Sequence, residues 1–190
     1  MSETPKMFTR AQLEWEAWIE PLAEDALTER QREALVDPAR TKSAYFRLLA
    51  RDPDALEART RTDKDIFYNV SIGVSRAERE LAAAAVSRLN GCIYCASVHA
   101  RFAATYSKRE ADVDRLLAEG IMASLGERWD AVVAAAVALT ATPPQFGAAE
   151  IEGLRAVGLD DLAIADVIYA ASFFNWANRL MLSLGEPHLT

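Results

Sequence analysis

The stretch Ser75–Tyr106, SRAERELAAAAVSRLNGCIYCASVHARFAATY, decides the fold and the chemistry of this chain. It contains both cysteines of the protein, Cys92 and Cys95, and His99, which is one of only two histidines. It also contains Glu80 on a helical surface that is otherwise small and apolar. The concentration of these side chains predicts a redox-active dithiol with its own acid–base partners.

Two helices joined by a tight turn are predicted within this stretch. The first helix opens at the capping box Ser75–Glu78, and the second opens at or near Cys92. Asn90 and Gly91 lie between them, and both residue types tolerate the left-handed conformation that ends a helix. We therefore expect the chain to turn back on itself at this dipeptide.

The spacing of the two cysteines and the histidine predicts thiol chemistry. Cys92, Cys95 and His99 are three and four residues apart, so they share one face of a helix. The helix N-terminus favours a thiolate at Cys92, and Cys95 lies within reach of the His99 imidazole. Such a dithiol can reduce a peroxide through a sulfenic acid and then close a disulfide, or it can exchange with an external disulfide.

The turn also determines whether Glu80 takes part. Measured from the turn, Glu80 lies about 15 Å along one helix and His99 about 12 Å along the other, so the two side chains can meet. A carboxylate beside the imidazole would orient the ring and complete a Glu–His–Cys relay. The alternative is that Glu80 is an ordinary exposed charge on a helix.

Composition predicts an all-α fold, because alanine and leucine dominate and glycine (8) and proline (7) are scarce. Residues 1–64 are predicted to form an N-terminal helical extension and residues 65–190 the core. The aromatic residues of the extension are interpreted as core or subunit packing. Helices are predicted at about 9–20, 28–36, 41–51, from 53, from 62–65, 75–89, 92–106, 107–120, 128–140, 148–157 and 160–184, followed by a loose tail from Gly185.

Charge and hydropathy exclude several classes of partner. The net charge of −7 and the pI near 5.0 argue against binding to nucleic acid or to an anionic membrane. No run of about 20 apolar residues is present, and the N-terminus lacks the apolar segment of a secretory signal. We therefore expect a cytoplasmic protein, in which a CxxC pair is catalytic or metal-binding rather than a structural disulfide.

A zinc site is the main alternative for the cysteine pair. Cys92, Cys95 and His99 would supply three ligands, and only Glu80 or the distant His188 could be the fourth. In that case the protein would be a non-catalytic or zinc-binding oligomeric module. A third alternative is another small-molecule activity in the same pocket.

The pattern E-x11-C-x2-C-x3-H, formed by Glu80, Cys92, Cys95 and His99, resembles the signature of the alkylhydroperoxidase-D-like branch of the carboxymuconolactone decarboxylase superfamily. The resemblance extends over roughly residues 65–185 and includes LNGCIYCASVHA and the later segment FFNWANRL. In overall length the chain is similar to the members described as peroxidase-related proteins. Their N-terminal helices are an extension of the core.

The resemblance implies an alkylhydroperoxidase-D-like helical bundle that assembles into dimers, trimers or hexamers and reduces peroxides without a metal or an organic cofactor. It implies that Cys95 attacks the peroxide, that Cys92 is its more exposed partner, and that Glu80 and His99 relay the proton. An external thiol or dithiol protein would be the reductant. Lactone decarboxylation is disfavoured because the decarboxylase branch lacks the dithiol.

Three further residues are candidates by position in the resemblance. Tyr94 stands where the well-studied alkylhydroperoxidase has a second histidine, and tyrosine, with a pKa of about 10, is no base near neutral pH. Asn175 and Arg179 lie in the FFNWANRL segment and are expected near the site.

Overall fold

The computed structural model describes residues 3–189, and within this range it confirms the all-α prediction. Its single sheet there has two strands. In chain order the elements are β1 (Leu13–Ala17), α1 (Glu29–Ala34), the 3₁₀ helix η1 (Pro38–Lys42), α2 (Ala44–Leu49), α3 (Pro53–Tyr68), α4 (Arg76–Leu89), α5 (Ile93–Ser107), α6 (Glu110–Glu119), α7 (Glu127–Thr140), α8 (Ala148–Ala156), α9 (Asp161–Leu184) and β2 (Gly185–Leu189).

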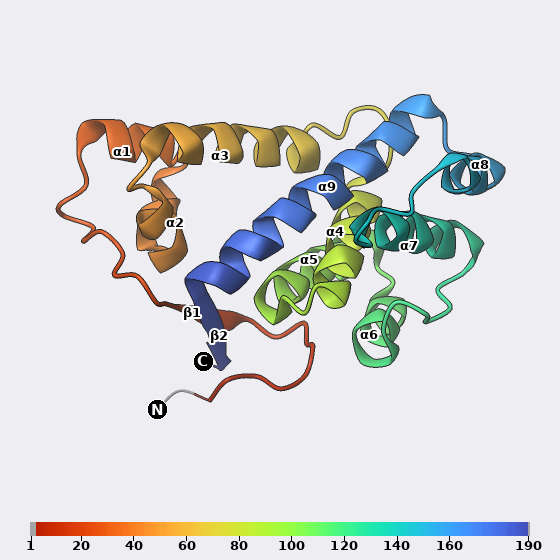
Figure 1. The fold of residues 1–190 in the computed structure, drawn as a ribbon, viewed down its shortest axis with the longest axis horizontal. Coiled ribbons are helices and arrows are strands. Elements are labelled where there is room, and N and C mark those ends of the chain that lie inside the picture. The colour runs from red at the N-terminus through yellow and green to blue at the C-terminus, as the bar shows by residue number, and fades with distance from the viewer. Residues whose placement is uncertain (1–2, 190) are drawn as a thin grey trace.

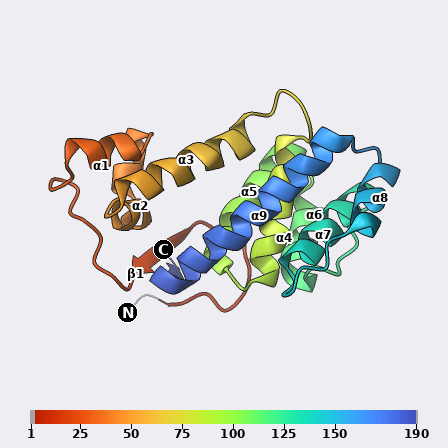
Figure 2. The same ribbon diagram turned by 45° about the horizontal axis from the view of Figure 1, so that its top comes forward.

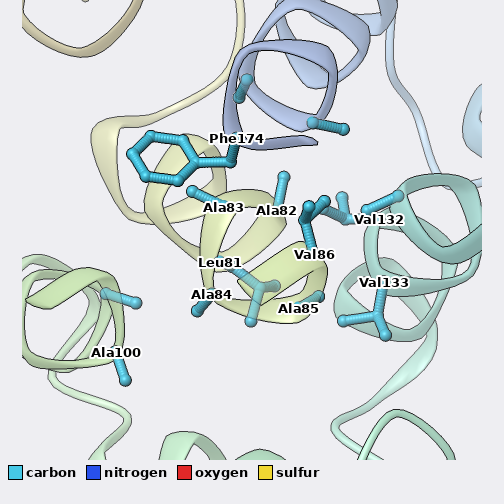
Figure 3. Packing of buried hydrophobic residues seen from close by; sticks show 14 of the residues in the cluster. Leu81, Ala82, Ala83, Ala84, Ala85, Val86, Ala100, Val132, Val133 and Phe174 are labelled. Carbon is cyan, nitrogen blue, oxygen red and sulfur yellow. The ribbon is translucent and has the colours of Figure 1, made fainter. Parts of the chain in front are cut away.

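Helix α4 is the centre of the molecule and contacts α5, α7 and α9 (Figure 1). Its alanines from Ala82 to Ala85 are completely buried. Figure 3 shows these small side chains between Ala100 of α5, Val132 of α7 and Phe174 of α9. Because alanine adds little volume, the neighbouring helices come close to α4 on several sides. Because the helices pack so closely, a polar side chain on α4 can also be buried.

The turn between α4 and α5 has the geometry that the sequence predicts. Gly91 is left-handed, with φ of 78°, and the N–H of Cys92 donates to the carbonyl of Ser87 at 2.9 Å. This is the hydrogen bond of a Schellman motif, and it ends α4. Asn90 keeps a right-handed backbone, and its side-chain amide donates to Asn175 and Asn178 of α9. The turn is therefore fixed to α9 as well as to its own helix.

The prediction of a helix over residues 9–20 is wrong. Residues 13–17 form β1, in which Leu13 and Trp15 are buried and Glu14 and Glu16 are exposed. This alternation has the period of a strand, not of a helix. The strand is stable because it pairs with a segment at the other end of the chain.

The prediction of a loose tail from Gly185 is wrong for the same reason. Residues 185–189 form β2, which pairs antiparallel with β1 in a register from Leu13 opposite Leu189 to Ala17 opposite Gly185. A contact between segments about 170 positions apart leaves no local signal in either segment. The sheet joins the two ends of the chain below α9 in Figure 1.

Helix α3 is one continuous helix from Pro53 to Tyr68, so the prediction of a separate helix from 62–65 is wrong. Asp52 caps it as expected, through a hydrogen bond from the N–H of Ala55 to its side chain. The boundary proposed after residue 64 therefore falls inside α3. In both Figure 1 and Figure 2, α1 to α3 lie on the opposite side of α9 from α6 to α8.

A buried ion pair fastens the loop between α3 and α4 to α9. Arg79 donates to the Asp166 carboxylate at 2.6 Å and also to the carbonyls of Ile66, Ile72 and Val74. Asp166 in turn accepts from the N–H of Val74. The pair therefore determines where α3 lies relative to α4 and α9.

We predict that Asp166→Ala lowers the free energy of unfolding by about 3–5 kcal/mol, because it leaves the buried Arg79 guanidinium without its counter-charge. Urea unfolding followed by circular dichroism measures this change. The control is Asp161→Ala, which removes an exposed partner of Arg155 and is expected to cost less than about 1 kcal/mol. Equal losses in the two variants would contradict the role given to the buried pair.

Candidate active site

The two cysteines lie side by side at the start of α5. Cys92 is the N-cap residue and Cys95 lies in the first turn, and their Sγ atoms are 2.8 Å apart as free thiols. Both residues are buried, with exposed fractions of 1% for Cys92 and 5% for Cys95. The expectation that Cys92 is the more exposed partner is therefore wrong. The Schellman turn places Cys92 beside Asn178 of α9, whereas Cys95 faces a cavity.

The two thiols differ in their tendency to ionise. The hydrogen bond from the Cys95 thiol lowers the pKa of Cys92, and the Cys95 backbone and Asn178 side chain act in the same direction against the effect of burial. The pKa of Cys95 is raised well above its ordinary value by the interaction with Cys92 and by burial. Cys92 therefore ionises first, and Cys95 requires a base.

A polar side chain of α9, Asn178, bonds to residues next to the cysteine pair. Asn178 is completely buried, donates to the Ser87 hydroxyl at 3.0 Å and accepts from the Asn90 amide at 3.1 Å. The sequence interpretation singled out Asn175 and Arg179 in this segment and missed Asn178. Its position one turn from Asn175 on the same helix face was the available signal.

Glu80 and His99 meet, as the turn between their helices predicted. The Glu80 carboxylate is completely buried and accepts a short hydrogen bond from Nδ1 of His99. Its other oxygen accepts from Nε of Arg76 at 2.5 Å. With the proton on Nδ1, the tautomer that this contact assigns, Nε2 is the basic nitrogen of the neutral ring. The alternative of an exposed Glu80 is wrong.

Aromatic rings hold the His99 imidazole in position. Phe174 of α9 lies edge-on to it with a centroid distance of 3.9 Å, and Phe67 of α3 lies at 5.4 Å. On the other side of Glu80, the Arg76 guanidinium stacks on Tyr68 at 4.1 Å. His99 is therefore held both by its hydrogen bond to Glu80 and by the aromatic rings.

Cys95, His99 and Glu80 open onto one cavity of about 190 Å³. An engineered apolar cavity of about 150 Å³ holds a benzene molecule, so this one has room for a single substituted ring. Elements from both ends of the chain line it: α2 and its cap, α3, α4, α5 and α9. The lining residues are Ser43, Tyr45, Phe46, Arg59, Asp63, Phe67, Tyr68, Arg76, Glu80, Tyr94, Cys95, Val98, His99, Phe102, Phe174, Ala177 and Met181.

The sequence interpretation missed the contribution of the N-terminal segment to this cavity. Tyr45 and Phe46 of α2 and Arg59 and Asp63 of α3 all line it, together with Cys95. The aromatic residues had been interpreted as packing alone. An arginine and an aspartate four residues apart on α3 were an available signal, but the same pair is common on exposed helices.

The three further candidates fall in two different places. Tyr94 lines the cavity, and burial raises the pKa of its hydroxyl, so it is a proton donor rather than a base. Asn175 and Arg179 do not line the cavity. Asn175 bonds to Asn90 and Thr140, and the exposed Arg179 donates to Asn175. These two residues therefore support the turn between α4 and α5 and do not line the cavity beside Cys95.

The zinc-site alternative finds little support in the arrangement of ligands. Among residues 3–189, no three His, Cys, Asp or Glu side chains form a group with the geometry to hold a metal ion. Nδ1 of His99 is bound to Glu80, and His188 stands in β2 opposite Glu14.

Among residues 3–189, no helix combines the length and apolar character needed to span a membrane.

Comparisons with known proteins agree with this architecture. Residues 53–138, which include α3, α4, α5 and the dithiol, match the sequence model of the carboxymuconolactone decarboxylase family. No curated protein matches the chain.

Several solved structures share the fold. An uncharacterized peroxidase-related protein from Ralstonia eutropha JMP134, with an alkylhydroperoxidase AhpD core, has a TM-score of 0.76 and 23% identity over 88% of this chain and 90% of its own. A peroxidase-related protein from Silicibacter sp. TM1040 has a TM-score of 0.75 and 24% identity over 90% of this chain and 92% of its own. The debrominase Bmp8, solved with tribromopyrrole, has a TM-score of 0.68 and 17% identity over 88% of this chain and 89% of its own.

At these identities the structures establish the fold, which is the alkylhydroperoxidase-D-like helical bundle. The family match covers the segment that carries Glu80, both cysteines and His99. Together, the family-model match over residues 53–138 and the shared fold support the resemblance of this chain to the alkylhydroperoxidase-D-like proteins of the carboxymuconolactone decarboxylase superfamily.

Proposed function

We propose that this protein is a thiol-dependent peroxidase that reduces small hydroperoxides with the Cys92–Cys95 dithiol. The observation that carries the proposal is the joint opening of Cys95 and His99 onto one cavity, with Glu80 bound to the far nitrogen of the imidazole. A base, a thiol and a space for substrate are thereby brought together. The family-model match over residues 53–138 and the peroxidase-related structural neighbours support a peroxidase-like role.

Cys95 is the cysteine that attacks the peroxide, because it lines the cavity and Cys92 does not. His99, one helical turn away, takes the thiol proton at Nε2 while Glu80 holds Nδ1. The Cys95 thiolate attacks the terminal oxygen of the hydroperoxide, and the O–O bond breaks. The departing alkoxide takes the proton from His99 and leaves as the alcohol, and Cys95 becomes a sulfenic acid.

Cys92 completes the reaction. Its sulfur, 2.8 Å from that of Cys95, gives up its proton and attacks the sulfur of the sulfenic acid. The S–O bond breaks, the hydroxyl leaves as water with that proton, and a disulfide forms. The lowered pKa of Cys92 favours the thiolate that this step requires. An external thiol or dithiol then restores both thiols by exchange, so that one peroxide and two reducing equivalents give one alcohol and one water.

We also expect the protein to act as a homo-oligomer, as the family resemblance predicts. Leu162, Tyr169 and Trp176 recur at intervals of seven on α9 and are exposed by 45%, 61% and 46%. Large apolar side chains aligned on one face are typical of a subunit contact.

A second candidate function is the reductive removal of a halogen from a small aromatic ring. The cavity is sized for one ring and has Phe67, Phe102 and Phe174 in its lining. One structural neighbour is a debrominase that binds tribromopyrrole. In such a reaction a dithiol would replace a carbon–halogen bond by carbon–hydrogen, release halide and become a disulfide. Halide release and peroxide consumption, assayed with the same protein, separate the two functions.

The roles of the two cysteines predict different outcomes for their serine variants. Cys95→Ser is expected to abolish peroxide consumption, whereas Cys92→Ser is expected to complete one attack and stop at the sulfenic acid. Mass spectrometry after peroxide and dimedone detects the adduct on Cys95 in the second variant. Full thiol-dependent turnover by Cys95→Ser would reject the assignment, and an adduct on Cys92 in that variant would move the attack to Cys92.

The raised pKa of Cys95 predicts how the reaction depends on Glu80. Glu80→Gln keeps the shape of the side chain but removes the charge that orients His99, so kcat/KM is expected to fall about 10²-fold at neutral pH. The loss is expected to persist as the pH rises towards 10, because the raised pKa of Cys95 keeps the thiol protonated unless a base takes its proton. Stopped-flow peroxide reduction between roughly pH 6 and pH 10 measures both effects.

Glu78→Gln is the matched control for this experiment. Glu78 is another buried carboxylate of α4, but it binds Arg128 and Ser75 and lies outside the cavity. The folded variant is expected to keep the wild-type rate and pH profile. A wild-type profile in Glu80→Gln as well would remove Glu80 from the mechanism.

A further inference from the structure

Arg59 lines the cavity although the peroxidase chemistry does not use it. Its side chain is 8% exposed and lies within 5.4 Å of the ring centres of both Phe46 and Phe173. One guanidinium nitrogen, Nη1, donates to Asp63 at 3.3 Å. Nε is buried and has no hydrogen-bond partner among residues 3–189, and the hydrogen bond to Asp63 uses only Nη1. A guanidinium carries several N–H donors, so the part of Arg59 that lines the cavity has donors left for a ligand.

Arg59 shares its carboxylate partner with a second arginine. Asp63 is its one carboxylate partner in the described chain, and the same Asp63 oxygen also faces Arg40 at 3.6 Å. Arg40 has a second acidic group nearby, Asp37. The other ion pair of the cavity, Arg76 with Glu80, is neutral in sum. An anion bound beside Arg59 would give this buried guanidinium a negative partner of its own.

Tyr45 adds a second donor at the same end of the cavity. Burial raises the pKa of its hydroxyl to about 12, although Arg59 acts against this rise. The hydroxyl therefore keeps its proton throughout the physiological range and can donate a hydrogen bond. Together, a guanidinium and a hydroxyl form the donor set that binds a carboxylate in many proteins.

The remainder of the cavity is suited to a hydrocarbon. Phe46, Phe67, Phe174 and Met181 line it, and its volume of about 190 Å³ has room for one ring. Cys95 also lines it, so a ligand held by Arg59 would present its other atoms to the thiol. A small apolar pocket with a few polar groups at one end fixes the orientation of its ligand.

We propose that this cavity is a binding site for small organic carboxylates, in which Arg59 and Tyr45 hold the acid group and the aromatic rings hold the hydrocarbon. Given the proposed function, on which this part rests, the preferred substrates are hydroperoxides that carry a carboxylate. The specificity is then determined by the N-terminal helices α2 and α3, and the chemistry by α4 and α5.

The test compares the binding of benzoate and benzamide, which have the same shape but differ in charge. Isothermal titration calorimetry of the reduced wild-type protein is expected to give an affinity for benzoate about tenfold or more above that for benzamide. Arg59→Gln is expected to abolish this preference by weakening benzoate alone. Tyr45→Phe, which removes a single hydroxyl, is expected to weaken benzoate about three- to tenfold and serves if Arg59→Gln does not fold.

Arg61→Gln is the matched control, because Arg61 lies on the same helix with a side chain that is 67% exposed. It is expected to leave both affinities unchanged. Equal binding of the two ligands by the wild type would overturn the proposal, as would a benzoate preference that survives both Arg59→Gln and Tyr45→Phe.

The result is independent of the proposed peroxidase activity, because benzoate binding needs no redox step. Turnover of the uncharged tert-butyl hydroperoxide is measured in parallel. A charge preference that depends on Arg59 in a protein without turnover would support the carboxylate site and contradict the peroxidase. Turnover without any charge preference would support the peroxidase and contradict the site.

Discussion

The site depends on one buried carboxylate, that of Glu80. A charged group without solvent is tolerated only where partners surround it, and Glu80 has Arg76 on one oxygen and His99 on the other. The two partners come from different helices, so the contact forms only after α4 and α5 have packed together. The alanines of α4 permit that approach, and the left-handed Gly91 directs it. The hydrogen bond between Glu80 and His99 therefore has two effects. It stabilises the buried carboxylate, and it orients the histidine beside the thiol.

The dithiol is asymmetric because its two members have different surroundings. Cys92 caps α5, where the exposed amides and the helix dipole stabilise negative charge. Cys95 faces the cavity, and its ionisation is opposed by the interaction with Cys92 and by burial. A cysteine that ionises readily but cannot reach the cavity, paired with one that faces it and needs a base, divides the work of a two-thiol reaction. In the proposed reaction, this division gives His99 the role of the base.

The sequence was most informative where the controlling interactions are local. Capping boxes, the Asn90-Gly91 turn and helix periodicity predicted α4, α5 and α9, and the spacing within those helices predicted that Glu80 would meet His99. It failed where segments distant in the chain meet: β1 with β2, and α2 and α3 with Cys95. Trp15 had been assigned to a helix because its strand partner near Pro187 is invisible locally. The burial of Cys92 could not be predicted either, because its neighbour Asn178 lies on α9, far along the chain.

The covering of the cysteines imposes different requirements on the two halves of the proposed reaction. A small hydroperoxide needs only the cavity, which Cys95 already lines. A thiol that reduces the resulting disulfide has to reach a sulfur atom, and both sulfurs belong to residues with exposed fractions of 5% or less. A protein reductant is far larger than a cavity of about 190 Å³, so it cannot reach them unless the covering segments move. The closed molecule is therefore suited to peroxide attack, and the same covering argues against a protein disulfide as its primary substrate.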